Sequence, residues 1–202
     1  MKRKIGVRDE KSIVNIPTLL NISRIILTFV VIYMIIIEAK VINIVILFAI
    51  AALTDFFDGK IARKYSLVNN FGRKADMVAD RFLWVGTASA FIVVFGIREQ
   101  LEIIHGVQIL LIMIREIIAA PSALVAFFSG RGFPHARFIA KATTFIQAFS
   151  LPALILSVHY PQWIYLSLPL SIINGTIGTI SGFCYIHDVQ QMEKKNERIR
   201  RG

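Results

Sequence analysis

Four aspartates lie at helical spacing in two short stretches of the sequence. Asp55 and Asp58 are three residues apart and Asp76 and Asp80 are four apart, so each pair would occupy one face of a helix. Four carboxylates in a low-dielectric crevice repel one another, and protonation or hard divalent cations would relieve the repulsion. Two Mg²⁺-type ions would cancel the formal charge. They could also bind phosphate oxygens and polarise a phosphorus centre.

Small and basic residues surround these aspartates. Gly59, Ala62 and Gly72 leave room for a substrate close to the helix backbone, and Arg63 offers a planar fork to phosphate. Each feature also has a structural explanation. The acid pairs could be solvated helix edges, the glycines packing contacts and the basic residues membrane anchors. Four acids paired on two adjacent membrane helices favour the chemical interpretation of the whole set.

The composition indicates that membrane helices position these residues. Of the 202 residues, 55% are hydrophobic and 18% are charged, against about 25% charged in an ordinary soluble domain. A net charge of +10 would suit a nucleic-acid partner, but the repeated apolar runs argue against one. A single cysteine excludes a disulfide scaffold. We therefore expect an all-α integral membrane protein.

The apolar runs predict a catalytic domain of six transmembrane helices over residues 16–189. Each helix is long enough to cross about 30 Å of hydrocarbon at about 1.5 Å per residue. The link at 66–70 would join the second and third as an antiparallel hairpin, which brings the two acid pairs to similar depth. Residues 1–15 form a basic arm or a short interfacial helix, and residues 190–202 a basic tail. The predicted spans are 16–37, 41–61, 71–97, 101–128, 137–158 and 163–189.

Loop charge predicts the orientation of these spans. Lys and Arg gather in the N-terminal arm, in the second and fourth connections and in the tail, whereas the opposite side offers only Lys40 and Arg98. This bias places both termini in the cytoplasm. Apart from Glu102, at the outer end of the fourth span, none of the charged residues inside the predicted spans falls in the outer half of the bilayer, which favours a polar cavity open to the cytosol.

The spacing of residues 55–80 matches a known pattern. Written as D-x2-D-G-x2-A-R-x8-G-x3-D-x3-D, it resembles the signature of the CDP-alcohol phosphotransferases, with every specified position present. The resemblance implies a phospholipid-synthesising enzyme, expected in the plasma membrane, in which a second alcohol displaces CMP from a CDP-linked alcohol, usually CDP-diacylglycerol. It also implies a homodimer and two bound divalent cations, Mg²⁺ or Mn²⁺.

The resemblance assigns roles to individual residues. Asp55, Asp58 and Asp76 would be metal ligands, and Asp80 would be both a ligand and the base that takes the acceptor's proton. The CDP site would be lined by Gly59, Ala62, Arg63 and Gly72. Phosphoryl-type transfer depends mainly on charge neutralisation and positioning, which agrees with these roles.

Three further segments resemble the phosphatidylglycerophosphate synthases of this family. They are residues 15–24, the triplet Arg115-Glu116-Ile117 and residues 140–147, and each of these regions departs from the pattern in places, at Thr18 and Thr143 for example. They make glycerol 3-phosphate the leading acceptor. Inositol phosphate, serine and phosphatidylglycerol remain alternatives.

Cations inside the predicted spans are candidates for binding an acceptor phosphate. Arg115 and Lys141 are the best placed, because a buried cation needs an anionic partner. Arg24 and the loop residue Arg137 are further candidates. Alternatively, Arg115 forms an ion pair with Glu116 or with one of the signature aspartates, and Lys141 extends to the lipid headgroups.

Two functions of other classes compete with the enzyme. A divalent-cation transporter could hold similar acids, but it should carry polar groups along both halves of its pathway, and here the outer half is almost purely apolar. A non-enzymatic scaffold has no need for Asp80.

Small residues in the last span suggest a packing surface. The run from Asn174 to Gly178, followed by Gly182, suits close helix packing, either within the fold or across a dimer.

Overall fold

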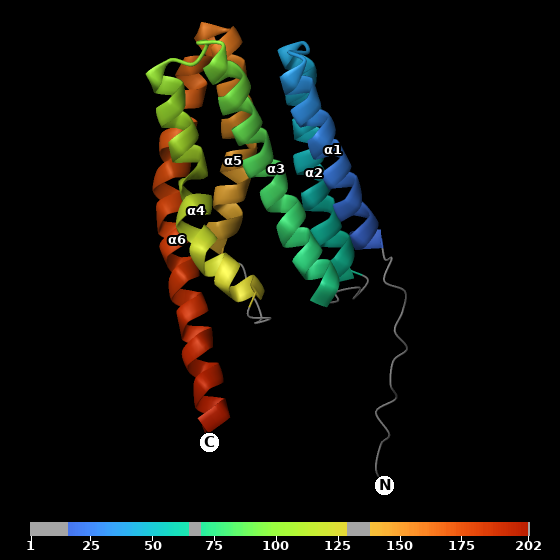
Figure 1. The fold of residues 1–202 in the computed structure, drawn as a ribbon, viewed down its shortest axis with the longest axis vertical. Coiled ribbons are helices and arrows are strands. Elements are labelled where there is room, and N and C mark those ends of the chain that lie inside the picture. Colours follow the sequence, from blue (N-terminus) through green and yellow to red (C-terminus); the bar gives the residue numbers. More distant parts are fainter. Residues whose placement is uncertain (1–15, 65–69, 129–137, 202) are drawn as a thin grey trace.

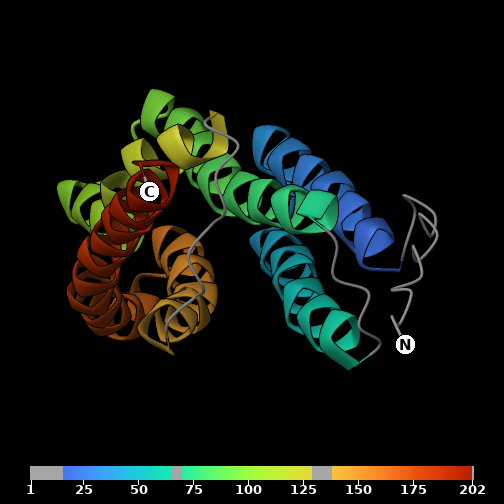
Figure 2. The same ribbon diagram turned by 90° about the horizontal axis from the view of Figure 1, so that it is seen from below.

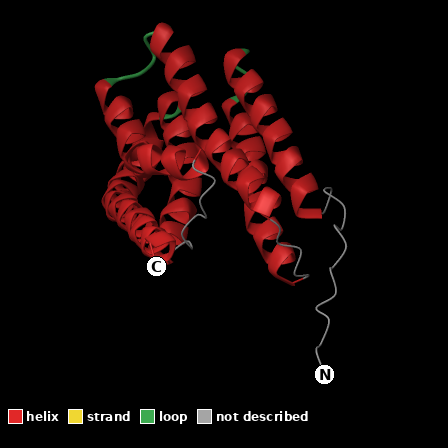
Figure 3. Ribbon diagram, turned by 60° about the horizontal axis from the view of Figure 1, so that its bottom comes forward, coloured by secondary structure: helices red, strands yellow, loops and turns green. Residues whose placement is uncertain are grey.

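The structure, a computed structural model, is all-helical in the part of the chain that it describes. It describes the backbone of residues 16–64, 70–128 and 138–201, and the side chains of residues 21–53, 78–125 and 138–192. Figure 3 shows helices and connecting loops and no strand over these ranges. The elements are α1 (Ile16–Ile36), α2 (Val41–Lys64), α3 (Asn70–Ile97), α4 (Ile103–Phe128), α5 (Phe138–His159), the 3-10 turn η1 (Pro161–Trp163) and α6 (Ile164–Arg201) (Figure 1).

The helices run up and down in alternation and form two groups of three. In the first group α1 packs along both α2 and α3, and in the second α6 packs along α4 and α5. The groups meet where α2 contacts α5 and α3 contacts α4, as the view from below shows (Figure 2). α1 begins, α2 ends, α3 begins and α6 ends at one end of the bundle (Figure 1), which we call the signature end.

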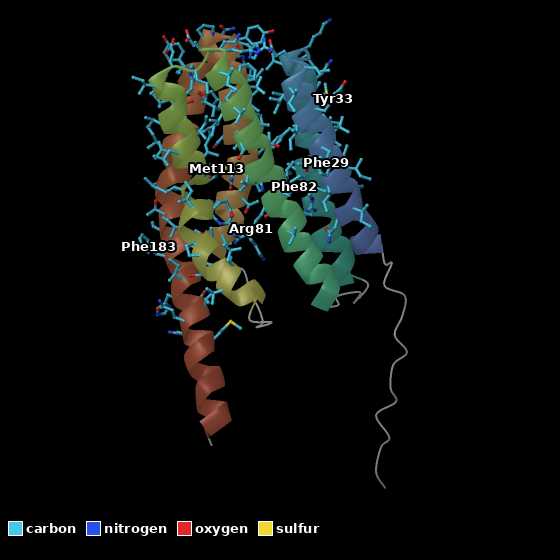
Figure 4. All side chains as sticks on the ribbon, viewed as in Figure 1. Phe29, Tyr33, Arg81, Phe82, Met113 and Phe183 are labelled. Atoms are coloured by element: carbon cyan, nitrogen blue, oxygen red, sulfur yellow. The ribbon has the colours of Figure 1, made fainter. Side chains whose placement is uncertain are left out.

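Apolar character identifies the chain as a membrane protein. Four helical segments are long and apolar enough to cross a membrane, and the described parts of α1 and α2 add two shorter apolar stretches. Large apolar side chains point outward along the bundle, for example Phe29 on α1 and Phe183 on α6 (Figure 4). Such surfaces suit lipid rather than water. The predicted all-α membrane fold is therefore confirmed at this level.

One apolar core joins the two helix groups. Phe48, Phe91 and Leu154 are fully buried in it, and they come from α2, α3 and α5. Trp84 of α3 meets Phe48 edge to face, with ring centroids 5.3 Å apart, an arrangement that aromatic pairs favour. The core fixes α3 between α2 and α4, and α3 carries the last residue of the signature.

Glycines on α6 allow it to lie unusually close to α4. A Cβ added at Gly175 would meet Cδ2 of Leu111 at 2.7 Å, and one added at Gly182 would meet Cβ of Ile118 at 2.9 Å. These distances are shorter than carbon atoms tolerate. The prediction of a close-packing surface on this helix is confirmed, and the surface is used within the fold.

A polar seam accompanies this contact. Asn174 Nδ2 donates to the carbonyl of Ile112 at 3.0 Å, and Ser167 Oγ donates to Gln108 Oε1 at 3.4 Å. All three of these polar side chains are fully buried. In an apolar membrane interior, such bonds satisfy groups that water cannot reach and fix the register of two helices.

At the end opposite the signature, α1 and α3 are each followed, two residues after the helix ends, by a glutamate with a left-handed backbone. Glu38 has φ 52° and Glu99 has φ 57°. After each, the next N–H bonds to a carbonyl five residues back, as Gln100 N does to Phe95 O at 3.0 Å, which is the Schellman pattern. Arg98 forms an ion pair with Glu38, so the turns after α1 and α3 are tied together.

The helix bounds agree with the predicted spans within three residues except at the end of α6. The last span was predicted to end at Val189, with residues 190–202 as a basic tail, and the helix continues through that tail to Arg201. The drop in hydropathy after Val189 marks a change of surroundings and does not end a helix. Residues 190–201 contain no Gly or Pro and are rich in Gln, Glu, Lys and Arg, all good helix formers. The N-terminal arm, residues 1–15, lies outside the described residues.

Candidate functional site

The signature residues occupy the last part of α2 and the first part of α3, at the signature end of the bundle. The contact of Phe48 with Trp84 sets the antiparallel register of these helices. Continued with regular helix geometry, that register brings the turn with Asp55 and Asp58 to the height of the turn with Asp76. The predicted similar depth of the acid pairs therefore agrees with the backbone.

Most side chains of the signature lie outside the described residues. This applies to three of the four aspartates, to the four residues of the predicted CDP site and to Arg137. Convergence of the carboxylates therefore stays a prediction. Among the side chains that are described, no three His, Cys, Asp or Glu residues come together as a metal site.

Asp80 is the one aspartate of the signature whose surroundings are described. Its Oδ1 accepts a hydrogen bond from Trp84 Nε1 at 2.9 Å, one helical turn further along α3. The Trp84 ring is buried, 2% exposed, and rests against Phe48. The indole thus orients the carboxylate from a position that the core holds fixed. Sequence analysis did not single out Trp84, although its i, i+4 spacing from Asp80 was a usable signal.

Arg24 lies at the level of the signature on the neighbouring helix. α1 and α3 run in the same direction, and Phe29 meets Phe82 with ring centroids 5.1 Å apart. Arg24 precedes Phe29 by five residues and so lies near the height of residue 77, between Asp76 and Asp80. Its side chain is fully buried. A fully buried guanidinium at this depth fits the predicted polar interior of the signature end.

Charged and polar side chains of α3, α4 and α5 form a cluster beside the signature. Glu116 Oε1 lies 3.7 Å from Arg115 Nε, and Glu116 Oε2 lies 4.0 Å from Arg81 Nε. Arg115 Nη1 also donates to Thr144 Oγ1 at 2.7 Å. The ion pair of Arg115 with Glu116, expected as an alternative, is confirmed. Sequence analysis assigned no role to Arg81, because only the fold brings it to α4.

The glycine contact between α4 and α6 positions this cluster. A Cβ placed on Gly178 would meet Cβ of Arg115 and Cγ2 of Ile114, both at 3.4 Å. At Gly182, the carbonyl oxygen of Arg115 is 3.6 Å away. Small residues on α6 thus set where the backbone of α4 lies, and with it the Arg115 and Glu116 side chains.

The α5 segment differs from the prediction in one respect. Lys141, a candidate for the acceptor phosphate, is exposed. Thr143 and Gln147 are fully buried instead, and within the described part of the chain neither Oε1 nor Nε2 of Gln147 has a hydrogen-bond partner. A buried amide without partners is costly, so Gln147 belongs with the candidate binding residues. Sequence analysis quoted this glutamine without assigning it a role.

An apolar groove opens between α3 and α4 next to the cluster. It has a volume of about 520 Å³. Arg81 and Glu116 are its charged lining residues, and the rest of the lining is mainly aliphatic, including Val85, Ile92 and Leu110. Figure 4 shows Arg81 in the space between these two helices. The charged cluster therefore borders a surface suited to hydrocarbon.

Comparison with known proteins identifies the family of this helical chain. The family model described as CDP-alcohol phosphatidyltransferase matches residues 14–174, which include the whole signature. A protein of Rickettsia typhi named CDP-diacylglycerol--glycerol-3-phosphate 3-phosphatidyltransferase is 33% identical over 176 residues, covering 85% of this chain and 94% of the relative. Proteins with the same name are 33% identical over 111 residues in Bacillus subtilis, covering 55% and 53%, and 39% identical over 71 residues in Escherichia coli K12, covering 34% and 39%.

These matches establish the class of protein. The chain belongs to the CDP-alcohol phosphatidyltransferase family. It is therefore an enzyme of phospholipid biosynthesis, a transferase of phosphate-containing groups, and the predicted resemblance is confirmed. Family membership favours the enzyme over the transporter and the scaffold.

Proposed function

We propose that this enzyme transfers the phosphatidyl group of CDP-diacylglycerol to glycerol 3-phosphate and releases CMP. The observation that carries the proposal is the similarity to the Rickettsia typhi protein of that name, which spans 85% of this chain and 94% of the relative. In the reaction a hydroxyl oxygen of the acceptor bonds to the phosphatidyl phosphorus. The bond from that phosphorus to CMP breaks, and the hydroxyl proton passes to a base.

Asp80 is the proposed base. Its Oδ1 is oriented by the Trp84 indole, and a positioned carboxylate within reach of the acceptor hydroxyl is what general-base catalysis requires. The carboxylate lies on the part of α3 where Trp84 faces α2, the helix that carries the first half of the signature. Asp80 therefore shares α3 with Asp76 and lies on a helix next to the one that carries Asp55 and Asp58.

Two divalent cations, Mg²⁺ or Mn²⁺, are proposed at Asp55, Asp58, Asp76 and Asp80. The donor set fits them, because carboxylate oxygens are the ligands these hard cations prefer, and the backbone register puts the two halves of the set at similar height. When bound, the cations would neutralise phosphate charge and polarise the phosphorus centre. The CDP moiety is proposed to lie along Gly59, Ala62, Arg63 and Gly72.

The acceptor phosphate is proposed to bind Arg115. This residue is held at the cluster beside Asp80, where its Nε contacts Glu116 and its Nη1 contacts Thr144. These two contacts orient the guanidinium, whose planar fork matches the geometry of a phosphate group. Arg24 is a second candidate by depth. Lys141 and Arg137 are proposed to act at the cytoplasmic entrance, since Lys141 is exposed and the side chain of Arg137 lies outside the described residues.

All six helices are proposed to span the plasma membrane, with both termini and the site on the cytoplasmic side. Basic residues concentrate at the signature end, and a water-soluble acceptor and CMP would enter and leave there. A homodimer is proposed as well. Labelling of single cysteines at the two ends of the bundle in intact cells would test the orientation, and cross-linking in membranes would test the dimer.

A product assay tests the function directly. Purified protein is incubated with CDP-diacylglycerol and Mg²⁺ or Mn²⁺, and glycerol 3-phosphate, inositol phosphate, serine and phosphatidylglycerol are offered separately. Release of CMP with phosphatidylglycerophosphate as the lipid product is expected for glycerol 3-phosphate alone. EDTA should stop the reaction and added Mg²⁺ or Mn²⁺ should restore it. A different lipid product would show that the proposed acceptor is wrong. Activity that survives EDTA would refute the proposed metal dependence.

A further inference from the structure

Two arginines from different helices converge on one buried carboxylate. Arg81 of α3 and Arg115 of α4 both contact Glu116 through Nε, and the Glu116 side chain is 8% exposed. One carboxylate balances one guanidinium, so these three side chains keep a formal charge of +1. The Arg81 and Arg115 side chains are 27% and 20% exposed, and a partly buried cation of this kind is stabilised by an anion. Because each arginine contacts the glutamate through Nε, the ends of both forks extend beyond it.

A hydroxyl donor from a fourth helix lies near the cluster. Tyr185 of α6 lies close enough to Arg81, Arg115 and Glu116 to interact with them electrostatically. Its hydroxyl oxygen is buried, and no residue of the described chain accepts or donates a hydrogen bond there. Burying an unpaired hydroxyl is unfavourable, and a bound anion would accept its proton in a hydrogen bond.

The cluster lies next to the proposed base in a geometry that suits a small acceptor. Asp80 and Arg81 are consecutive, so their Cα atoms are about 3.8 Å apart, and their side chains diverge by about 100° around α3. Asp80 is on the side where Trp84 packs against α2, and Arg81 reaches Glu116 on α4. A three-carbon alcohol could therefore present its hydroxyl to Asp80 while its phosphate rests at the cluster.

We propose that Arg81 and the Tyr185 hydroxyl, together with Arg115, form the site that selects an acceptor bearing a phosphate monoester. Glu116 is a positioning residue that holds the two guanidinium groups at the correct spacing. A phosphate monoester carries a charge of about −1.5 to −2 at neutral pH, which the cluster charge and the tyrosine donor would match. This inference rests on the proposed transferase function, and it adds residues that the signature and the three synthase-like segments do not contain.

Substitution kinetics test the assignment. Arg81→Gln and Tyr185→Phe should each raise the KM for glycerol 3-phosphate about tenfold or more, because each removes a hydrogen bond to a charged group. The KM for CDP-diacylglycerol should change less than about threefold, and Arg81→Lys should restore part of the loss. Arg98→Gln and Tyr165→Phe are matched controls, since both side chains are exposed and lie at the end opposite the signature. These controls should leave both constants unchanged.

A binding measurement separates a recognition role from a structural one. Glycerol 3-phosphate should raise the thermal unfolding temperature of the wild type and of both controls, whereas glycerol should not. Arg81→Gln and Tyr185→Phe should remain folded and lose most of this protection. Glu116→Gln should weaken protection while keeping the volume of the side chain. Full protection in Arg81→Gln and Tyr185→Phe, or an equal rise in KM for both substrates, would overturn the inference.

The same experiments distinguish this inference from the proposed function. If the wild type forms no phosphatidylglycerophosphate but uses another phosphorylated alcohol, the proposed acceptor fails, and the predicted KM changes should appear with that alcohol. If it uses only an acceptor without phosphate, the inference fails while the transferase activity stands.

Discussion

Gly182 offers the sharpest test of how the helix packing supports the site. It lies where α6 crosses α4, and an added Cβ would be 2.8 Å from Cγ2 and 2.9 Å from Cβ of Ile118. Carbon atoms prefer about 3.5–4.0 Å, so the contact is too short by about 0.6 Å or more. The Cβ of Ile118 is bonded to the backbone and cannot rotate away. Gly182→Ala therefore forces the two helices apart.

The size of the effect can be isolated with a matched substitution. Gly106→Ala also replaces a helical glycine, in α4, but an added Cβ there meets nothing within 4 Å. Both changes gain about 1 kcal/mol of helix propensity, so their difference reports packing alone. Overpacking costs about 1–3 kcal/mol. At about 2–4 °C per kcal/mol for a chain of this size, Gly182→Ala should unfold about 2–12 °C below Gly106→Ala.

Thermal unfolding in detergent, followed by loss of monodisperse protein, measures this difference. Gly175→Ala provides an intermediate case, because its closest contact is the mobile end of the Leu111 side chain at 2.7 Å. Gly182→Ala should also lower activity, since the clash with Ile118 would shift the part of α4 that carries Arg115 and Glu116. Equal unfolding temperatures for Gly182→Ala and Gly106→Ala would refute the close contact.

Four further changes give defined outcomes. Asp80→Asn keeps an oxygen that can accept from Trp84 but removes the base, so CMP release should fall by about a hundredfold or more while the protein elutes as a folded species; near-normal turnover would refute the base assignment. Trp84→Phe keeps an aromatic ring against Phe48 and removes the donor to Asp80, so kcat should fall about tenfold with little change in KM; an unchanged kcat would show that the indole does not orient the carboxylate. Asn174→Leu removes the bond to the Ile112 carbonyl and should cost about 0.6–1.7 kcal/mol in detergent unfolding, and a more stable variant would contradict the role of the polar seam. Glu99→Gly relieves the left-handed strain at φ 57° and should raise stability by about 1 kcal/mol, whereas a loss would mean that the Glu99 side chain contributes more than its backbone costs.

The features set by local pattern were predictable from sequence. Membrane helices follow from apolar length, and five of the six predicted ends agree with the helices within three residues, the end at Val189 being the exception. Charged residues past the membrane boundary continue α6 to Arg201, because hydropathy records the solvent while helix propensity decides where a helix stops. The signature was recognisable because its residues are close together in the chain.

The features set by packing were not predictable in the same way. The contact between Arg81 and Glu116 joins residues 35 positions apart, and it depends on how α3 leans on α4. The burial of Gln147 and the exposure of Lys141 depend on the rotation of α5 about its axis. The spacing of residues within one helix does not predict this rotation, because α5 is apolar on several sides and only weakly amphipathic. Packing against the neighbouring helices determines it.

The division of the bundle into two groups of three helices has an evolutionary consequence. The signature is confined to α2 and α3, whereas Arg115, Glu116, Thr144 and Tyr185 come from α4, α5 and α6. Under the proposed assignment of the two sites, drift in the second half of the gene would alter which alcohol is accepted while the nucleotide chemistry encoded in the first half stays intact. Arg81 is the exception, because it lies on α3 in the first half but contacts Glu116 in the second half. A substitution at Arg81 would therefore require a matching change in the second half.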